Sequence, residues 1–449
     1  MTATLLGLSM ATLLATPLDT GSYEIRYTGS LSQVSREGTG KAAKRFSMYC
    51  LLTDNQDGQR ELSFLVDERG GAGWHWPERF GFITLNEKNQ PSNKARIQLL
   101  HEHLENHYPL ALQQPVFEHF DKIKTTKKFK DGQFEYQVTG KKKIKDFDCL
   151  QVEIATNFGR RQTLSVDQKS GLIIAAEQRV FMGQGDQFSL KMELNAFRAV
   201  DQERLEELLP PLKTLRQLQI DLGRKENEKK HDLNAKQLAE AKKVLVQLEK
   251  EADSTPFSRL ASVINRDVKS QLQRTGDVAT LAKKYLGKPA QKFELKLLNN
   301  SKIESSDLAG KIQVLHFWDY RGEPLDEPYG QVGYLDFLNS RLKKHEVKFI
   351  GVAVNPNLAD RTQVSGVLRS VRKLKSFMNL SYDIALDDGS LLRKFGDPTK
   401  MGAKLPLWVV IDGEGKIVHY HVGFYKINPD EGLRELETVI VAEIKNRRK

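Results

Sequence analysis

The fold is decided by the stretch Ile312-Gln313-Val314-Leu315-His316-Phe317-Trp318-Asp319-Tyr320-Arg321-Gly322-Glu323-Pro324. The part up to Trp318 is mostly apolar and free of glycine and proline, which indicates a strand buried in a sheet. The part from Asp319 onward mixes charges with glycine and proline, which is typical of a loop. Pro324 and Pro328 then stiffen the approach to a helix that is expected to begin near Tyr329.

Working outward, further segments frame this strand in a fixed order: Gly287-Lys288-Pro289-Ala290, Phe293-Glu294-Leu295, Asp307-Leu308-Ala309-Gly310-Lys311, Val347 to Val354, and Leu405-Pro406 to Asp412, with a hairpin turn at Asp412 to Gly415. In this order the segments resemble those of TlpA-like redoxins. The resemblance implies a thioredoxin-like α/β fold for residues 287–449. It also places the cis proline of the family at Pro406.

The chain departs from this family where the chemistry resides. Active members open the helix after Phe-Trp with Cys-x-x-Cys, since the helix N-terminus lowers the thiol pKa and favours the attacking thiolate. The corresponding window, Asp319 to Leu325, holds no cysteine, and the two cysteines of the chain are Cys50 and Cys149. We therefore expect the domain to be inactive by the dithiol route. The alternative is a thiol supplied by a partner, or by Cys50 or Cys149 in space.

Two functions from different classes remain open. The first is a redox-inactive binding or scaffold protein of the bacterial cell envelope, with a protein or lipid partner. The second is a thiol-disulfide oxidoreductase or a peroxide-reducing redoxin, as the resemblance implies. For the first function we expect no catalytic residue, no metal and no cofactor. The recognition site would then be the degenerate loop opposite Pro406, although a solvated loop without function is the alternative; the loop comprises Trp318, Asp319, Tyr320, Arg321, Gly322, Glu323 and Pro324.

Length and composition fit a protein of several domains. The chain has 449 residues, of which 39% are hydrophobic and 28% charged, and about 150 residues per domain suggests roughly three domains. The formal net charge of +11 favours anionic partners. There is no zinc-finger spacing, no RNA-binding aromatic motif and no continuous basic helix, so we expect no nucleic-acid partner.

Residues 1–20 contain an apolar run from Thr4 to Ala15. The run has the length of a secretory signal and is too short for a stable membrane anchor. However, no positive charge precedes it, since the first basic residue is Arg26. We expect a periplasmic or secreted protein, with a buried N-terminal helix of a cytoplasmic protein as the alternative. No later apolar run reaches about 18 residues, so integral membrane insertion is not expected.

Residues 21–200 alternate apolar and polar positions with period two, as half-buried antiparallel strands do. The alternation predicts a large, strongly curved antiparallel sheet or an open barrel, with strands at Phe46–Leu52, Leu62–Val66, Phe134–Val138 and Leu150–Ile154. Cys50 is in phase with the apolar face, which predicts a buried thiol. Cys149 is out of phase with Leu150, which predicts a partly exposed thiol on the opposite face and argues against a disulfide between the two.

Apolar residues at helical spacing predict that a helix from Ala95 to Tyr108 interrupts this sheet. On such a helix His103 and His107 would share one face, a spacing that can bind a metal ion. Leu104 stands where a zinc peptidase would need its glutamate, so solvated histidines are preferred. His419 and His421 likewise share one face of a C-terminal strand without a recognisable third ligand.

Residues 201–286 are rich in helix formers and predict a central helical hairpin with a charged turn at Lys225 to Lys230. Pro210-Pro211 is interpreted as a helix stop, and separate helices are expected from Phe257 to Leu272 and from Thr275 or Asp277 to Tyr285. Packing within the chain is preferred for this hairpin over binding of a partner helix or dimerisation. The whole chain is thus predicted to be an α+β multidomain protein with boundaries at residues 21–200, 201–286 and 287–449.

Overall fold

The computed structural model describes residues 21–35, 38–54, 59–69, 76–86, 89–92, 95–104, 106–224, 232–320, 331–427 and 432–447. The chain forms two compact units, one extending to Val268 and the other beginning at Lys269. The expected signal at residues 1–20 and the charged turn at 225–230 lie outside the described residues.

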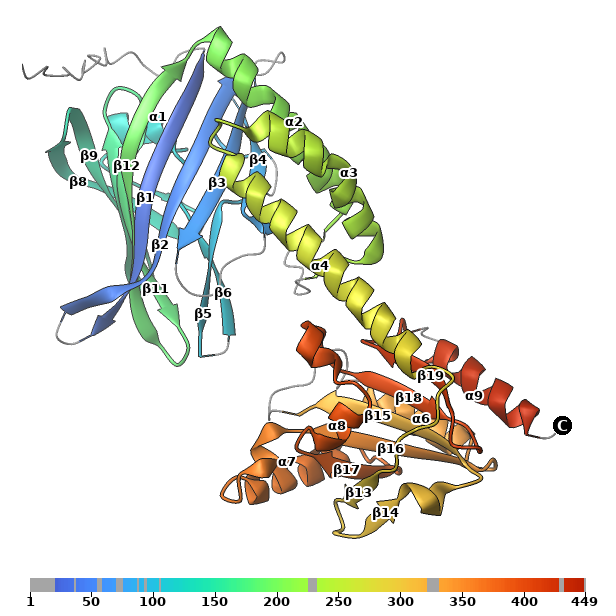
Figure 1. Cartoon of the computed structure of the whole chain (residues 1–449). Coiled ribbons are helices and arrows are strands. Elements are labelled where there is room, and N and C mark those ends of the chain that lie inside the picture. Colours follow the sequence, from blue (N-terminus) through green and yellow to red (C-terminus); the bar gives the residue numbers. More distant parts are fainter. Residues whose placement is uncertain are drawn as a thin grey trace, which may run out of the picture. The chain divides into compact units, whose positions relative to one another are not determined.

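The first unit is built on a ten-stranded antiparallel sheet with the order β4-β3-β2-β1-β12-β11-β10-β9-β8-β7 (Figure 1). Its order begins at β4 and ends at β7, so the sheet is open. The four strands predicted from the sequence lie in β2, β3, β8 and β9. The bounds are β1 Ser22–Ser35, β2 Gly38–Asp54, β3 Arg60–Arg69, β4 Phe80–Leu85, β7 Lys128–Asp131, β8 Phe134–Ile144, β9 Phe147–Thr156, β10 Gly159–Asp167, β11 Ile173–Met182 and β12 Asp186–Val200.

The two faces of this sheet are covered by different elements. On one face the core contains alternate residues of β1 and β2, such as Ile25 and Met48. The short helix α1 (Phe120–Thr125) and the hairpin of β5 (Gln98–His103) and β6 (Asn106–Ala111) pack there. The ammonium group of Lys44 donates to the Leu100 carbonyl and fixes β5 against β2.

The hairpin of β5 and β6 replaces the helix that was predicted from Ala95 to Tyr108. His103 is paired with Asn106, and Leu104 lies at the turn with φ of 48° and 60% of its surface exposed. Ile97, Leu99 and His101 are buried at every second position, as in a strand, and Leu100 between them is buried as well. The prediction of a helix here was therefore wrong.

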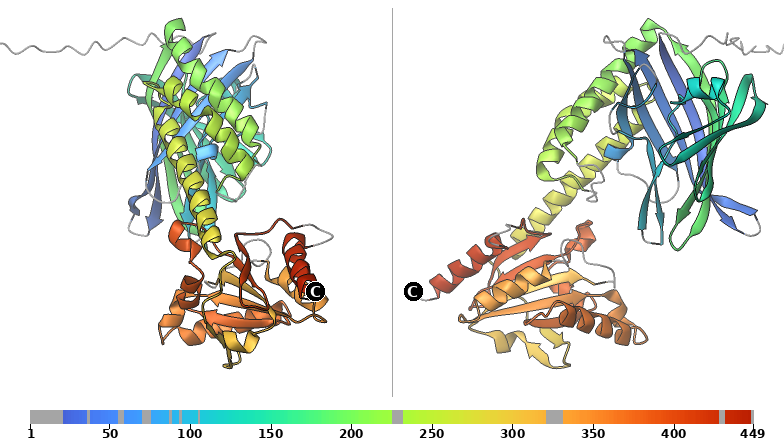
Figure 2. Two further views of the ribbon diagram at one scale, coloured as in Figure 1. Left: turned by 45° about the vertical axis from the view of Figure 1, so that its right-hand side comes forward. Right: turned by 180° about the vertical axis from the view of Figure 1, so that it is seen from behind.

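The other face is covered by helices α2 (Gln202–Leu222), α3 (Ala235–Ala252) and the first part of α4 (Ser258–Tyr285) (Figure 2). Helix α2 lies beside α3, and Tyr49 of β2 meets Phe257 edge to face at 5.4 Å. These helices up to Val268 belong to the same compact unit as the sheet. The packing within the chain that was preferred for the hairpin is therefore present.

Two helix boundaries predicted from the sequence were wrong. Pro210 and Pro211 lie inside α2, where Asp201 caps the first turn and buried leucines on both sides of the prolines hold the chain helical. Helix α4 runs without a break over 28 residues. The hydroxyl of Thr275 donates to the carbonyl of Gln271 at 2.8 Å, so this threonine bonds to the preceding turn and does not cap a new helix.

The second unit contains a seven-stranded sheet of order β14-β13-β17-β16-β15-β18-β19 (Figure 1). Strands β15, β16 and β17 are parallel, and β18 is antiparallel to β15. The bounds are β13 Glu294–Leu297, β14 Lys302–Glu304, β15 Ile312–Asp319, β16 Val347–Val354, β17 Asp383–Asp387, β18 Leu407–Ile411, β19 Ile417–Val422, α6 Val332–Arg341, α7 Val364–Phe377, α8 Ser390–Lys394 and α9 Arg434–Asn446.

Hydrophobic clusters lie on both faces of this sheet. One contains side chains of α6, α7 and α9, and the other contains side chains of α8 together with Leu281 of α4. The unit is thus a three-layer α/β/α domain, as the thioredoxin-like prediction requires.

Candidate functional site

The candidate site in the second unit lies where β15 ends beside the start of β18. Phe317 of β15 pairs with Leu407 of β18 in antiparallel register. Because the two strands run in opposite directions, Pro406 lies beside Trp318. The Leu405–Pro406 peptide bond is cis, and the Pro406 carbonyl accepts a hydrogen bond from the Gly423 amide at 2.7 Å. Trp318, the first residue of the predicted loop, and the predicted proline therefore lie at the same end of these two strands.

The first part of the degenerate loop is held firmly. Trp318 is 1% exposed and Tyr320 is 8% exposed, and their rings meet edge to face at 5.5 Å. The Tyr320 amide donates to the Val354 carbonyl, and its own carbonyl accepts from the Asn355 side chain. Asp319 between them is partly exposed. The remaining predicted loop residues lie outside the described residues, namely Arg321, Gly322, Glu323 and Pro324.

A buried histidine lies directly upstream of this edge. The ring of His316 stacks on the Trp408 indole with centroids 3.7 Å apart. Burial lowers its pKa to about 3, and neither ring nitrogen has a hydrogen-bond partner in the described part of the chain. The imidazole is therefore neutral and behaves as part of the core. Sequence analysis did not identify His316, although a single ionisable residue inside an apolar strand is the signal that marks it.

A second group of rings connects β19 to the start of α6. Nε2 of His419 lies 2.7 Å from the Tyr425 hydroxyl, and the His421 ring stacks on Tyr425 at 4.1 Å. Burial lowers the pKa of both His419 and His421. The backbone of Tyr425 exchanges two hydrogen bonds with the buried side chain of Gln331, at 2.8 and 3.1 Å. Gln331 directly precedes α6, so this cluster fixes the helix that follows the loop.

The histidines do not form a metal site in the part of the chain that is described. No group of three or more His, Cys, Asp or Glu side chains has metal-binding geometry there. His419 and His421 do share one face of β19, with parallel rings 6.3 Å apart. His103 instead meets Asp186 at 2.7 Å, and His107 stands opposite Glu102 in the hairpin. The face that His103 and His107 were predicted to share does not exist.

Both cysteines are buried in the first unit and are free. Burial raises the pKa of Cys50 far above its ordinary value and that of Cys149 to about 11. The prediction that Cys149 is partly exposed was wrong. Cys149 and Leu150 are consecutive and both are buried, so both faces of β9 are covered at this point.

Comparison with known proteins finds a family match within the second unit. Residues 286–420 match the model of the AhpC/TSA family. A thiol-disulfide oxidoreductase ResA of Bacillus thuringiensis is 28% identical over 152 residues, which are 33% of this chain and 76% of the relative. The ResA protein of Bacillus cereus is 28% identical over 148 residues, with the same shares of both chains.

Solved structures are similar to about a third of this chain. A thiol:disulfide interchange protein of Chlorobium tepidum covers 35% of this chain and 97% of its own, with 17% identity and a TM-score of 0.27. A secreted disulfide oxidoreductase of Mycobacterium tuberculosis covers 33% and 95%, with 18% identity and a TM-score of 0.25. The family match and the order of the strands together identify the C-terminal part of this chain as a redoxin domain of the AhpC/TSA family.

Proposed function

We propose that this protein is a redox-inactive redoxin that works as a binding or scaffold protein of the bacterial cell envelope. The observation that carries the proposal is the lack of any cysteine between Asp319 and Leu325, where the redoxin frame brings β15 next to Pro406. Thiol-disulfide exchange proceeds through a mixed disulfide and needs a thiolate at this position.

The cysteines elsewhere in the chain offer no substitute. Cys50 and Cys149 belong to the first unit, are completely buried, and have raised pKa values. Reactive cysteines have the opposite properties, since they are partly exposed and have lowered pKa values. These thiols therefore support a structural role rather than a resolving role.

The edge beside Pro406 supports binding of an extended segment of a protein partner. Within the described residues, Leu405 has no backbone hydrogen bond, whereas Pro406 and Leu407 are tied to Gly423 and Phe317. An extended peptide can pair with such an open backbone edge and add main-chain hydrogen bonds to it. Because pairing of this kind needs no thiol, it is compatible with loss of the cysteines.

An insulin-reduction assay with dithiothreitol as the electron donor tests the redox half of the proposal. We expect the rate to equal the rate without protein, for the wild type and for the double variant Cys50→Ser with Cys149→Ser. Turnover by the wild type that is lost in the double variant would reveal exchange through a buried thiol. Turnover that survives in the double variant would overturn the argument from cysteines altogether.

Affinity capture from the native cell envelope, followed by mass spectrometry, tests the binding half. The test variant reverses two loop charges, Arg321→Glu with Glu323→Arg. The matched control reverses the exposed ion pair of Glu294 and Lys302, which are 2.9 Å apart on β13 and β14 at the far edge of the sheet from β18. We expect the loop variant, and not the control, to lose a partner that the wild type retains, at unchanged melting temperature. Equal recovery with both variants would contradict a recognition role for this loop.

Location in the envelope remains a prediction from residues 1–20. None of the helices in the described part of the chain has both the length and the hydropathy to span a bilayer. Cell fractionation of the natural host, with antibodies against the redoxin domain, is the direct measurement. Recovery in the cytoplasmic fraction alone would contradict the envelope assignment while leaving the redox argument intact.

A further inference from the structure

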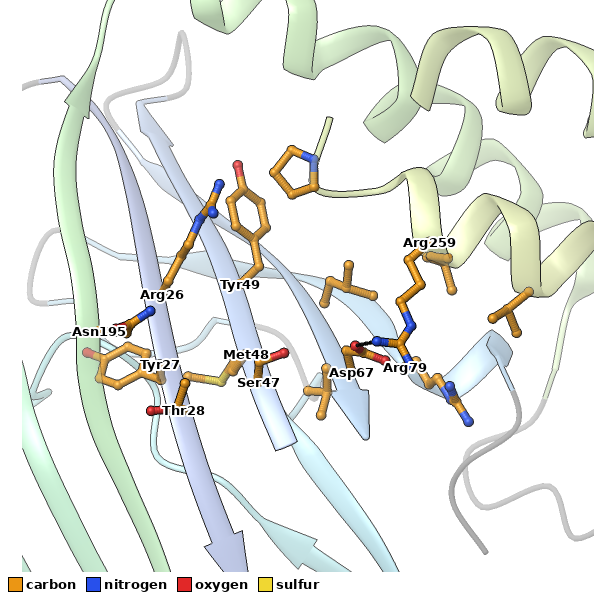
Figure 3. A pocket seen from close by; sticks show the side chains of 15 residues that line it. Arg26, Tyr27, Thr28, Ser47, Met48, Tyr49, Asp67, Arg79, Asn195 and Arg259 are labelled. Carbon is orange, nitrogen blue, oxygen red and sulfur yellow. Dashed lines mark ion pairs between the residues drawn. The ribbon is translucent and has the colours of Figure 1, made fainter. Parts of the chain in front are cut away.

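A cavity of about 300 Å³ lies in the first unit between the sheet and the start of α4 (Figure 3). Strands β1, β2 and β3 form its floor, and the first turns of α4 form one wall. This volume is at the lower end of the range for small-molecule sites. Every lining residue belongs to the first unit, and Tyr27, Met48 and Val66 of its main core are among them.

The floor consists of two rows of side chains that cross the three strands. In one row Arg26 pairs with Tyr49, and Tyr49 pairs with Leu65. In the next row on the same face, Thr28 pairs with Ser47, and Ser47 pairs with Asp67. The first row is mostly covered, since Tyr49 and Leu65 are each 7% exposed, whereas Thr28 and Ser47 are open to solvent. The site thus has an apolar inner part and a polar mouth.

A β-bulge turns an additional polar side chain toward this floor. Arg26 pairs with Ala196 and Tyr27 pairs with Leu194, so Asn195 is the extra residue on β12. Asn195 lines the cavity. Bulges re-aim side chains and are common beside binding sites. The bulge therefore adds an amide group at the end of the cavity where Arg26 lies.

The wall formed by α4 has one apolar stripe with a charge at its edge. Leu260 and Val263 of α4 share one helix face and line the cavity, together with Pro256 in the turn before the helix. Arg259 also lines it and forms an ion pair with Asp67 at 2.7 Å. Figure 3 shows Arg26 on one side of the cavity and Arg259 with Arg79 on the other, with Ser47 and Met48 between them.

The lining brings cationic side chains to both ends of the cavity. Arg26 lies at one end, and Arg79 and Arg259 lie at the other, where Arg259 is paired with Asp67. Arg26 shares the carboxylate of Glu24 with Arg198 and Arg204, which both form ion pairs with it. A guanidinium nitrogen of Arg26 lies 3.8 Å from a carboxylate oxygen of Glu24, and the guanidinium carbon lies 5.6 Å from the centre of the Tyr49 ring. An arginine held in this way can still offer its donors to an oxyanion.

From these features we infer that this cavity binds a small organic anion, a carboxylate or phosphate group on a short apolar body. The anionic group would lie at the mouth among Arg26, Ser47 and Asn195. The apolar body would lie against Tyr49, Leu65 and Leu260. The binding needs neither the redoxin loop nor a thiol, so it is independent of the function proposed above.

Isothermal titration of the full-length protein at low salt tests this inference with defined probes. Octanoate and octyl phosphate carry both features, octyl glucoside carries only the apolar chain, and inorganic phosphate carries only the charge. We expect saturable binding of at least one octyl anion at one site per chain, and an affinity that falls as salt is added. The octyl anion that binds with the higher affinity identifies the head group that the site prefers. Equal binding of octyl glucoside, or no binding of either octyl anion, would overturn the inference.

Two variants and a control locate the site. Arg26→Gln should weaken binding of the octyl anion about ten-fold or more, because a charge-assisted hydrogen bond is lost. Ser47→Phe should abolish binding by filling the cavity while keeping every charge. Arg179→Gln removes one exposed charge from β11 of the same sheet and should bind like the wild type. If Ser47→Phe does not fold, the affinities of Arg26→Gln and Arg179→Gln for the octyl anion still test the location of the site. Wild-type affinity in Arg26→Gln would overturn the assignment of the site.

Discussion

His316 and Trp408 stack face to face in the centre of the redoxin domain, with ring centroids 3.7 Å apart and an interplanar angle of 13°. Neither nitrogen of the imidazole has a hydrogen-bond partner in the described part of the chain, and burial lowers the pKa to about 3. Trp408 in turn donates its indole N–H to the Gly423 carbonyl at 3.1 Å. A neutral imidazole here acts as a flat ring that fills the core, and a proton on it would be a buried, unpaired charge.

The first prediction is that acid destabilises the redoxin domain through His316. The folded pKa lies below the ordinary value of 6.5, so between these values the unfolded chain takes up a proton that the folded domain does not. The contribution of the neutral His316 to the free energy of unfolding is therefore fully present above pH 6.5 and is lost as the pH falls toward 3. From pH 7 to pH 5 the loss should be about 2 kcal/mol from this group. His419 and His421 shift in the same direction and add to the loss.

The variant His316→Leu isolates this effect. We expect its free energy of unfolding to depend less on pH than that of the wild type, by about 2 kcal/mol between pH 7 and pH 5. Hydrogen exchange of peptides from β15 and β18, measured at both pH values and corrected for intrinsic exchange rates, reports the redoxin domain alone. Parallel pH dependence of the two proteins would mean that His316 is protonated or solvated in the folded state.

The second prediction concerns the buried ion pair of Lys44 and Glu68, at 2.9 Å with side chains 0% and 2% exposed. Lys44→Met leaves the Glu68 carboxylate buried without its cation, and should cost about 3 kcal/mol or more of unfolding free energy. The double variant Lys44→Met with Glu68→Leu should recover most of that loss. As a control, Lys128→Met breaks a surface pair with Glu135 and should cost less than about 1 kcal/mol. Urea unfolding of the wild type, of Lys44→Met, Glu68→Leu and their double variant, and of Lys128→Met is the measurement, and additivity of the two core substitutions would contradict the pairing.

The third prediction is that both thiols are protected until the first unit unfolds. Cys50 and Cys149 are completely buried and their pKa values are raised, so access and thiolate formation are both suppressed. A disulfide reagent at pH 8 should react with no cysteine in the native protein and with both in urea. In urea, Cys149→Ser should react with one equivalent of the reagent, through Cys50. The contrary result is one thiol that reacts rapidly in the native wild type and not in native Cys149→Ser. That result would show that Cys149 is exposed, as its position in the strand pattern predicted.

The sequence predicts the redoxin frame well, because its strands are short apolar segments bounded by turns. Strands β15, β16 and β18 occupy the stretches named for them, and Asp412 to Gly415 turns the chain into β19. These strands are buried on both faces, so their near-continuous apolar composition is a direct consequence of their place in the sheet. The Phe-Trp end of β15 could be placed for the same reason.

Predictions failed where tertiary contacts outweighed local preference. Pro210 and Pro211 would end an isolated helix, but buried leucines on either side keep α2 intact. Cys149 looks exposed only if β9 has one solvated face, and the sequence does not reveal that both faces are covered. The cavity in the first unit could not be found at all. It depends on Arg26 and Arg259, which are more than two hundred positions apart, and on a bulge at Asn195 that leaves no pattern in the sequence.

The last prediction concerns Gln331 and the cluster around Tyr425. Gln331 is completely buried, and its amide both donates to the Tyr425 carbonyl at 2.8 Å and accepts from the Tyr425 amide at 3.1 Å. Gln331→Leu leaves both backbone groups buried without partners and should cost about 2 kcal/mol. Tyr425→Phe removes only the hydroxyl that meets His419, keeps both amide bonds, and should cost about 1 kcal/mol. Hydrogen exchange of α6 should accelerate strongly in Gln331→Leu and little in Tyr425→Phe. Equal acceleration in the two variants would show that the ring cluster, and not the amide of Gln331, holds the helix that follows the loop.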